Sequence, residues 1–302
     1  MKSGILNVYK EKGFTSHDVV AKVRFLLGTR KVGHAGTLDP DATGVLPVLV
    51  GNAAKACDLI PEDTKTYRAS LRFGISTDTE DVWGKILRED DARPKRSELE
   101  EAMKEFLGAY QQIPPMVSAV KVDGKKLYEY ARAGITVERK PRPVTVHSFE
   151  LLSFSENEAE FRAKVSRGTY IRTLLVDLCA KLGVLGAMSA LEREESAGLG
   201  LDTAVTLSCL EKMEGEERKK WLLPTEWLFR AHPVFELPPF FDRLVANGCA
   251  VNVEKLGLDS AAAGSRYRLY QNGVFFAVGE IREEEGAKKL FKIKNFPPDG
   301  EA

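Results

Sequence analysis

The chain has 302 residues, of which 43% are hydrophobic and 29% are charged, and its 44 Lys and Arg balance 44 Asp and Glu. This composition is typical of a globular protein with one sizeable core and a small second domain, and it excludes a disordered chain. Because phosphate groups are bound by Lys and Arg, a chain of zero net charge can bind nucleic acid only if its positive charge gathers on one face.

The first half of the chain combines short strands with one clear helix. Residues 5–9 are strand-like, and Thr15 and Ser16 are candidate caps for a helix over residues 18–27. A stretch rich in Gly and Asp, residues 33–44, precedes an apolar run at 45–50 that predicts a buried strand. Residues 66–73 alternate like a strand.

The middle of the chain predicts two further helices. Residues 97–106 form the first, with Ser97 and Glu100 at capping-box spacing. Residues 161–165 and 170–171 are strand-like, and residues 174–182 predict an amphipathic helix that ends at Gly183. This order of elements, without regular βαβ alternation, predicts an α+β fold with a largely antiparallel sheet.

From about residue 237 the sequence changes to short strand-like runs at 267–270, 274–281 and 290–293. Asn272-Gly273 between two of these runs is a strong hairpin signal. We therefore predict two domains, residues 1–235 and a small β-rich domain of residues 236–302.

Several classes of site and location are disfavoured by the sequence. Neither dinucleotide-binding nor P-loop glycine spacing is present, so we expect no cofactor. The histidines are scattered, and Cys57, Cys179, Cys209 and Cys249 lie far apart, which predicts no metal site and reduced, mostly buried thiols. We found no stretch that would span a bilayer and no secretory signal, and we expect a cytoplasmic protein.

The most informative segment reads G-H-A-G-T-L-D-P-D-A-T-G-V-L, from Gly33 to Leu46. Its glycines permit close approach of a ligand, and Pro40 restricts Asp39 to an extended conformation. The residues alone leave two interpretations open: a structural turn in which Asp39 bonds nearby backbone, or a loop that presents a carboxylate to a ligand.

This segment resembles the catalytic motif of the bacterial TruB family of tRNA pseudouridine synthases, approximately G-H-x-G-x-L-D-P-x-A-x-G-x-L, and every fixed position matches. Three more blocks follow in the family's order: Lys65-Thr66-Tyr67, residues 114–132, and Gly168-Thr169-Tyr170-Ile171-Arg172-Thr173. The resemblance covers residues 4–201. The C-terminal part is similar only in character to a PUA-type RNA-binding domain. The implied fold has a central mixed sheet.

The resemblance implies that uridine 55 in the T-loop of tRNA is isomerised to pseudouridine. The N1–C1′ bond breaks, the uracil turns, and C5 joins C1′, without a cofactor. Asp39 is then the essential carboxylate and Arg172 its partner, since a guanidinium orients a carboxylate and favours its ionised form. Asp39 could attack C1′ or C6, or assist a glycal intermediate; the sequence leaves these alternatives open.

A base inside folded RNA must be extruded before it can react. By resemblance, Tyr67 packs on the extruded base, Leu191 supplies an apolar contact, and Lys65 belongs to the same binding block as Tyr67. His34 would contact the RNA near the vacated position. The structural alternatives are a strand aromatic for Tyr67, a core leucine for Leu191 and a satisfied structural histidine for His34.

Residues 121–143 resemble the thumb segment that grips RNA in this family. Their cations outnumber Asp123, Glu129 and Glu138, so they form a candidate surface for the RNA backbone: Lys121, Lys125, Lys126, Arg132, Arg139, Lys140 and Arg142. The alternative is a solvated charged face. We expect the T-arm of tRNA as partner, no membrane, no required protein partner and a monomer.

Two positions depart from the family pattern. Met188 stands where many members carry a histidine, and Glu192 replaces one of two paired arginines. We expect these departures to affect RNA contacts rather than the reaction. Two other functions stay open: an RNA-binding folding factor for tRNA with secondary catalysis, and a subunit of a guide-RNA particle. The short thumb favours a stand-alone enzyme.

Overall fold

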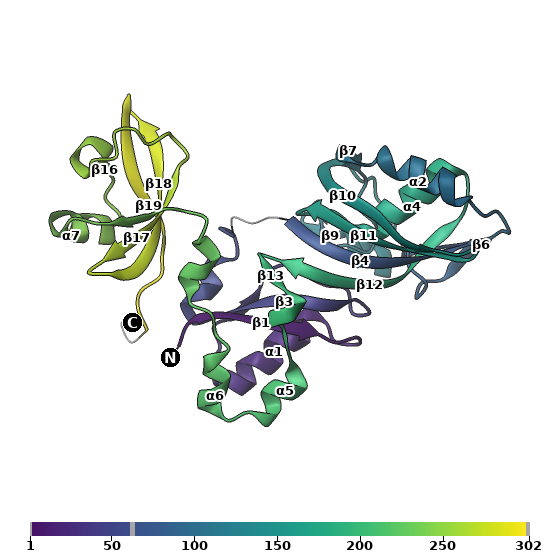
Figure 1. Cartoon of the computed structure of the whole chain (residues 1–302), viewed down its shortest axis with the longest axis horizontal. Coiled ribbons are helices and arrows are strands. Elements are labelled where there is room, and N and C mark those ends of the chain that lie inside the picture. The colour runs from purple at the N-terminus through teal and green to yellow at the C-terminus, as the bar shows by residue number, and fades with distance from the viewer. Residues whose placement is uncertain (1, 61–63, 300–302) are drawn as a thin grey trace.

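The computed structural model describes residues 2–60 and 64–299 (Figure 1). These residues form two two-stranded sheets, β5 (Ile75–Thr77) with β6 (Ile86–Glu89) and β8 (Lys121–Val122) with β9 (Lys125–Lys126), and two large sheets. The larger has ten strands: β1 (Gly4–Lys10), β2 (Val32–His34), β3 (Thr43–Val50), β4 (Thr64–Phe73), β7 (Gly108–Gln112), β10 (Arg142–Phe154), β11 (Glu158–Ser166), β12 (Gly186–Ser196), β13 (Leu199–Gly200) and β14 (Val205–Thr206). Its main path runs β14-β1-β3-β12-β4-β11-β10-β7. The β1–β14 and β3–β12 pairs are parallel and the others antiparallel, which confirms a mixed, largely antiparallel sheet.

Seven α-helices are present in the described part of the chain: α1 (Ser16–Leu27), α2 (Arg96–Lys104), α3 (Leu127–Arg132), α4 (Ile171–Leu182), α5 (Leu207–Lys212), α6 (Gly215–Lys220) and α7 (Asp242–Ala246). Short 3₁₀ turns lie at η1 (Gly51–Ala56), η2 (Leu201–Thr203), η3 (Thr225–Phe229), η4 (Pro239–Phe241) and η5 (Val253–Leu256). Thr15 caps α1 and exchanges hydrogen bonds with Asp18, and Gly183 ends α4 at a φ of 69°, both as expected.

Three local predictions were wrong. Tyr170 and Ile171 are not a strand, because Tyr170 is the N-cap residue of α4 and Ile171 is the first residue of that helix. The β-branched side chain of Ile171 favours strands, which explains the wrong prediction. Ser97 does not cap α2, because the helix already begins at Arg96 and its N-cap residue is Lys95. The backbone N–H of Lys95 donates to the carboxylate of Glu98 at 3.0 Å. The cysteines are not mostly buried, since Cys209 and Cys249 are exposed.

The alternation of β4 separates the two faces of the large sheet. Tyr67, Ala69 and Leu71 are buried against α4, whereas the residues between them point to the opposite, more open face. Residues paired across strands share a face, and β12 pairs Leu191 with Ala69 and Arg193 with Tyr67. Strand β12 therefore turns both side chains to the α4 side.

The smaller sheet has the order β15-β17-β18-β19-β16 and is made of β15 (Val234–Glu236), β16 (Val251–Asn252), β17 (Arg266–Gln271), β18 (Val274–Glu284) and β19 (Ala287–Asn295). Asn272 and Gly273 both have positive φ, at 52° and 74°, and form the predicted hairpin turn. Phe296 and Val278 pack with Ile5 of β1, so the two sheets share a hydrophobic contact. Residues 300–302 of the predicted second domain lie outside the described residues.

Candidate active site

A cavity of about 280 Å³ lies where the 36–39 loop, β4, β12 and the N-terminus of α4 meet. It brings together segments that are far apart in the sequence. The lining residues are Gly36, Thr37, Leu38, Asp39, Lys65, Tyr67, Val117, Ser118, Ala119, Arg167, Gly168, Thr169, Tyr170, Ile171, Arg172 and Leu191. Five of the six residues predicted to perform or surround the chemistry therefore share one cavity; His34 lies beside it.

Asp39 and Arg172 form an ion pair in this cavity. The Nε of Arg172 donates to Oδ2 of Asp39 at 3.1 Å. The arginine side chain is only 3% exposed, whereas the aspartate side chain is 43% exposed. The buried guanidinium thus orients a carboxylate whose other side is open to a ligand.

The rest of the Arg172 guanidinium is held by the protein. Nη1 donates to the carbonyl of Thr79 at 2.6 Å, and Nη2 donates to the carbonyl of Val117 at 3.0 Å. Asp81 approaches Nη1 at 3.8 Å, and burial raises the pKa of its carboxyl. Because these partners fix the plane of the guanidinium, its direction toward Asp39 is set before any substrate binds.

Tyr67 and Leu191 form the apolar wall of the cavity. Their side chains come from adjacent strands, and both residues are mostly buried, at 7% and 9% exposure. Lys65 lines the same cavity two residues before Tyr67. A planar base in this space would lie between an aromatic or aliphatic wall and the Asp39 carboxylate.

His34 ends β2 two residues before Gly36, and its ring centroid lies 5.6 Å from that of His17 on α1. Burial lowers its pKa, and the positive charges of His17 and Arg193 act in the same direction. His34 is therefore neutral near pH 7, so its ring can pack against a base without the desolvation cost of a charge.

Sequence reasoning missed two buried cations behind the Asp39 loop. Lys10 is fully buried, and its Nζ donates to the carbonyls of Phe14 and Pro40 at 2.7 and 3.0 Å. Burial lowers the pKa of Lys10 to about 8, against the opposing effect of Asp39. Arg193 is also fully buried and donates to three carbonyls around the loop. A Lys at the end of an apolar run, or an Arg between two Glu, carries no signal of burial in the sequence.

The thumb segment consists of a hairpin, β8 (Lys121–Val122) and β9 (Lys125–Lys126), followed by α3. Lys121, Lys125, Arg132, Lys140 and Arg142 are exposed, and Lys126 is half-buried. The cations of Lys126 and Arg132 lie 5.3 Å from the ring centroid of Tyr128. Arg139 differs, because it is half-buried and donates to the carbonyl of Pro114 at 3.0 Å.

The two departures from the family pattern lie away from the cavity. Met188 is 1% exposed and packs in the core against α4. Glu192 pairs across the strands with Arg68 on the opposite face of the sheet, where its carboxylate accepts from the hydroxyl of Tyr9 at 2.8 Å. Neither residue contributes to the lining of the Asp39 cavity.

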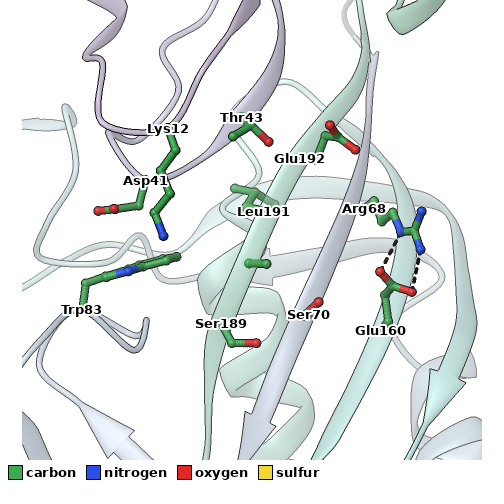
Figure 2. Close-up of a pocket in the computed structure, with 11 residues that line it drawn as sticks. Lys12, Asp41, Thr43, Arg68, Ser70, Trp83, Glu160, Ser189, Leu191 and Glu192 are labelled. Atoms are coloured by element: carbon green, nitrogen blue, oxygen red, sulfur yellow. Dashed lines mark hydrogen bonds and ion pairs between the residues drawn. The ribbon is translucent and has the colours of Figure 1, made fainter.

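A second pocket, of about 310 Å³, occupies that opposite face (Figure 2). Within it, Arg68 and Glu160 form two hydrogen bonds at 2.6 and 2.9 Å, and Lys12 lies over the ring of Trp83. Asp41 lines this pocket, two residues from Asp39. We place the candidate active site in the Asp39 cavity because it combines the Asp39 carboxylate, the buried Arg172 guanidinium and the apolar wall of Tyr67 and Leu191.

Within residues 2–60 and 64–299, no cluster of three or more His, Cys, Asp or Glu side chains could hold a metal ion. In the same residues, no helix is both long and apolar enough to cross a membrane.

Comparison with known proteins identifies the family. The sequence model described as "TruB family pseudouridylate synthase (N terminal domain)" matches residues 24–171. The tRNA pseudouridine synthase B of Alkaliphilus oremlandii is 41% identical over 96% of this chain and 97% of the relative. The chain belongs to the TruB family of pseudouridylate synthases. The family's fold and the α+β architecture predicted from the sequence agree.

Other TruB-family relatives give the same result. The tRNA pseudouridine synthase B of Clostridium tetani is 38% identical over 95% of this chain and 98% of the relative, and that of Streptococcus sanguinis is 48% identical over 74% and 79%. Among solved structures, the "Crystal Structure of a Cbf5-Nop10-Gar1 Complex" contains a chain with a TM-score of 0.74 and 26% identity. That match covers 98% of this chain and 85% of the other, so the similarity includes both sheets.

Proposed function

We propose that this protein converts uridine 55 in the T-loop of tRNA to pseudouridine, with Asp39 as the catalytic carboxylate. The observation that carries the proposal is the Asp39–Arg172 ion pair, which lies in a cavity beside Tyr67 and Leu191. The names of the relatives, tRNA pseudouridine synthase B, support tRNA as the substrate.

The cavity suits a single extruded base. Its volume of about 280 Å³ is near the lower end of ligand-pocket volumes, which begin at about 300 Å³, and its lining includes Val117 and Ala119, just before the thumb segment. An extruded uracil would pack on Tyr67 and Leu191, and these contacts would offset part of the cost of unstacking it. Arg172 would keep the Asp39 carboxylate aimed at the ribose and the base.

The isomerisation balances without a co-reactant. The N1–C1′ bond breaks, the detached uracil turns within the cavity, C5 bonds to C1′, and the proton on C5 leaves while N1 gains one. Asp39 acts as nucleophile at C1′ or C6, or as the base that forms a glycal intermediate. The hydroxyl of Tyr67 is the candidate to help remove the C5 proton.

The RNA would be held outside the cavity by two parts of the chain. The exposed thumb cations Lys121, Lys125, Arg132, Lys140 and Arg142, with Lys126 beside them, would contact backbone phosphates. Residues 236–302 would act as a PUA-like RNA-binding domain next to the catalytic domain of residues 1–235. We propose that the protein acts as a monomer in the cytoplasm and needs no protein partner, although the similar Cbf5 chain was solved with Nop10 and Gar1.

The test is to incubate the purified protein with an unmodified tRNA transcript and map pseudouridine by mass spectrometry, with no guide RNA or second protein. Pseudouridine that forms at uridine 55 and at no other position supports the proposal. Tight tRNA binding without product would instead favour a folding factor. Product that requires an added guide RNA would place the protein in a guide-RNA particle.

A further inference from the structure

We propose that Arg193 is the positioning residue that fixes the Asp39 loop and therefore the direction of the Asp39 carboxylate. The inference rests on the proposed function, since the loop matters through the reaction at Asp39. Arg193 lies on β12, and its side chain reaches the loop from the α4 side of the sheet without lining the cavity. It acts through the loop backbone and does not touch the reacting atoms.

The guanidinium joins the two ends of the loop. Nε donates to the carbonyl of Val45 at 2.7 Å, and Nη2 donates to the carbonyl of Gly36 at 3.0 Å. Nη1 points at the carbonyl of Thr37 at 3.5 Å, a weaker contact. Gly36 precedes Asp39 in the sequence and Val45 follows it. Because the planar guanidinium of Arg193 binds both, it fixes the distance between the two ends of the loop.

The remaining carbonyls of the loop also have partners. Leu38 accepts from the hydroxyl of Ser16, Asp39 accepts from the backbone N–H of Ala42, and Pro40 accepts from Lys10. Every carbonyl from residue 36 to residue 40 is therefore occupied. Among the described residues, Arg193 donates to two of these five carbonyls, whereas Lys10 and Ser16 each donate to one.

Two glycines make room for this arrangement. A side chain at Gly36, where φ is +85°, would meet Cε and Nζ of Lys65 at 3.2 Å and Nη1 of Arg193 at 3.4 Å. A side chain at Gly44, where φ is +103°, would meet the backbone oxygen of Arg193 at 2.3 Å, well inside van der Waals contact. The glycines at these two motif positions thus explain how the loop packs directly against Arg193.

A lysine cannot replace this arginine. All three acceptors are backbone carbonyls that lie in different directions around a fully buried guanidinium. A lysine ammonium is a point charge on a flexible stem and cannot reach both ends of the loop in one plane. Losing the donors also leaves the buried carbonyl of Val45 and the partly buried carbonyl of Gly36 without this partner, which loosens the loop.

The first test compares Arg193→Lys and Arg193→Met with wild type on tRNA. We expect kcat to fall about ten- to a hundred-fold, the cost of a misplaced reacting group, while KM stays within about three-fold. The matched control is Arg162→Met, an arginine on β11 that pairs with Glu194 and is 43% exposed, and it should keep wild-type kcat. Wild-type kcat in Arg193→Met, or a loss that appears mainly in KM, would overturn the proposal.

A second measurement does not depend on activity. Hydrogen exchange of the peptide covering residues 36–45 should accelerate in Arg193→Lys and stay at the wild-type rate in Arg162→Met, with thermal melting recorded for both proteins. Unchanged exchange of this peptide in Arg193→Lys would refute the role of Arg193 even if the proposed function failed. If the exchange accelerates in Arg193→Lys but the wild-type protein forms no pseudouridine, the proposed function is rejected and the role of Arg193 in fixing the loop stands.

Discussion

The guanidinium of Arg172 lies 3.1 Å from the carboxylate of Asp39, although 133 positions separate the two residues. One member of the pair is buried and held by backbone carbonyls, and the other is open to the cavity. This asymmetry separates two tasks. Arg172 belongs to the rigid frame, and Asp39 is free to meet the substrate.

Replacing Arg172 by lysine should therefore damage turnover more than binding. The lysine would leave the carbonyls of Thr79 and Val117 without their donors and would no longer orient Asp39. We expect kcat to fall by about a hundred-fold with little change in tRNA affinity. Single-turnover kinetics and filter binding measure the two quantities. Arg68→Lys, on the opposite face of the sheet, is the control and should leave both unchanged.

Tyr67 tests the separate roles of a ring and a hydroxyl. Tyr67→Phe keeps the packing surface and removes the hydroxyl, so it should retain tRNA affinity and slow turnover by about ten-fold or more if the hydroxyl transfers the C5 proton. Tyr67→Leu also removes the aromatic face and should be slower still. Single-turnover rates decide this, with Tyr267→Phe in the smaller sheet as control. Equal rates for wild type and Tyr67→Phe would exclude proton transfer by this hydroxyl.

Asp177 on α4 should make stability depend on pH. Burial, with a contribution from the negative charge of Glu80, raises its pKa from 3.8 to about 6. Between these values the folded protein binds more protons than the unfolded chain, so stability falls as pH rises from about 4 to about 6.

The variant Asp177→Asn removes that cost. Because the residue is partly solvated, we expect a gain of only about 1–2 kcal/mol at pH 7, which disappears toward pH 4. Denaturant unfolding at both pH values measures it. Glu217→Gln, an exposed residue, should give no gain, and an Asp177→Asn protein no more stable than wild type at pH 7 would contradict this reading.

The sequence led us to expect that Glu192 affects RNA contacts, but its position predicts that restoring the family's arginine there should not improve tRNA binding. Glu192 lies on the sheet face opposite to the catalytic cavity, where it accepts from Tyr9 and pairs across the strands with Arg68. Glu192→Arg would lose the hydrogen bond and place two cations side by side, which should cost about 1 kcal/mol of stability. Its tRNA affinity at physiological salt should stay within about two-fold. A ten-fold tighter complex would show that this face contacts RNA.

The sequence predicted most residues of the candidate site because its signals are contiguous. Residues 33–46 form one unbroken motif, and Tyr67 and Arg172 lie in short blocks of their own. Alternating or continuous apolar runs predicted strands β1, β3, β4 and β11, and Asn272-Gly273 predicted the C-terminal hairpin, whereas no strand was predicted where β10 and β12 lie. The α+β fold and the family were both confirmed.

What could not be predicted depends on pairing between distant strands. Arg193 received no role from the sequence, and only the register of β12 places it under the Asp39 loop. Lys10 is the last residue of an ordinary strand, and only the folded chain shows its burial. Arg139 was grouped with the thumb cations by charge, yet its guanidinium bonds the carbonyl of Pro114. Side-chain direction in such cases is set by tertiary contacts rather than by local pattern.

The most direct test of the account compares Asp39→Asn with Asp41→Asn. Both substitutions remove one carboxylate from the same loop, but Asp41 lines the pocket on the opposite face of the sheet. Pseudouridine at uridine 55 of an unmodified tRNA transcript is quantified by mass spectrometry. We expect Asp39→Asn to bind tRNA normally and to form product at least about a hundred-fold more slowly than wild type, with Asp41→Asn near wild type. Wild-type turnover by Asp39→Asn would contradict the assignment of the catalytic carboxylate.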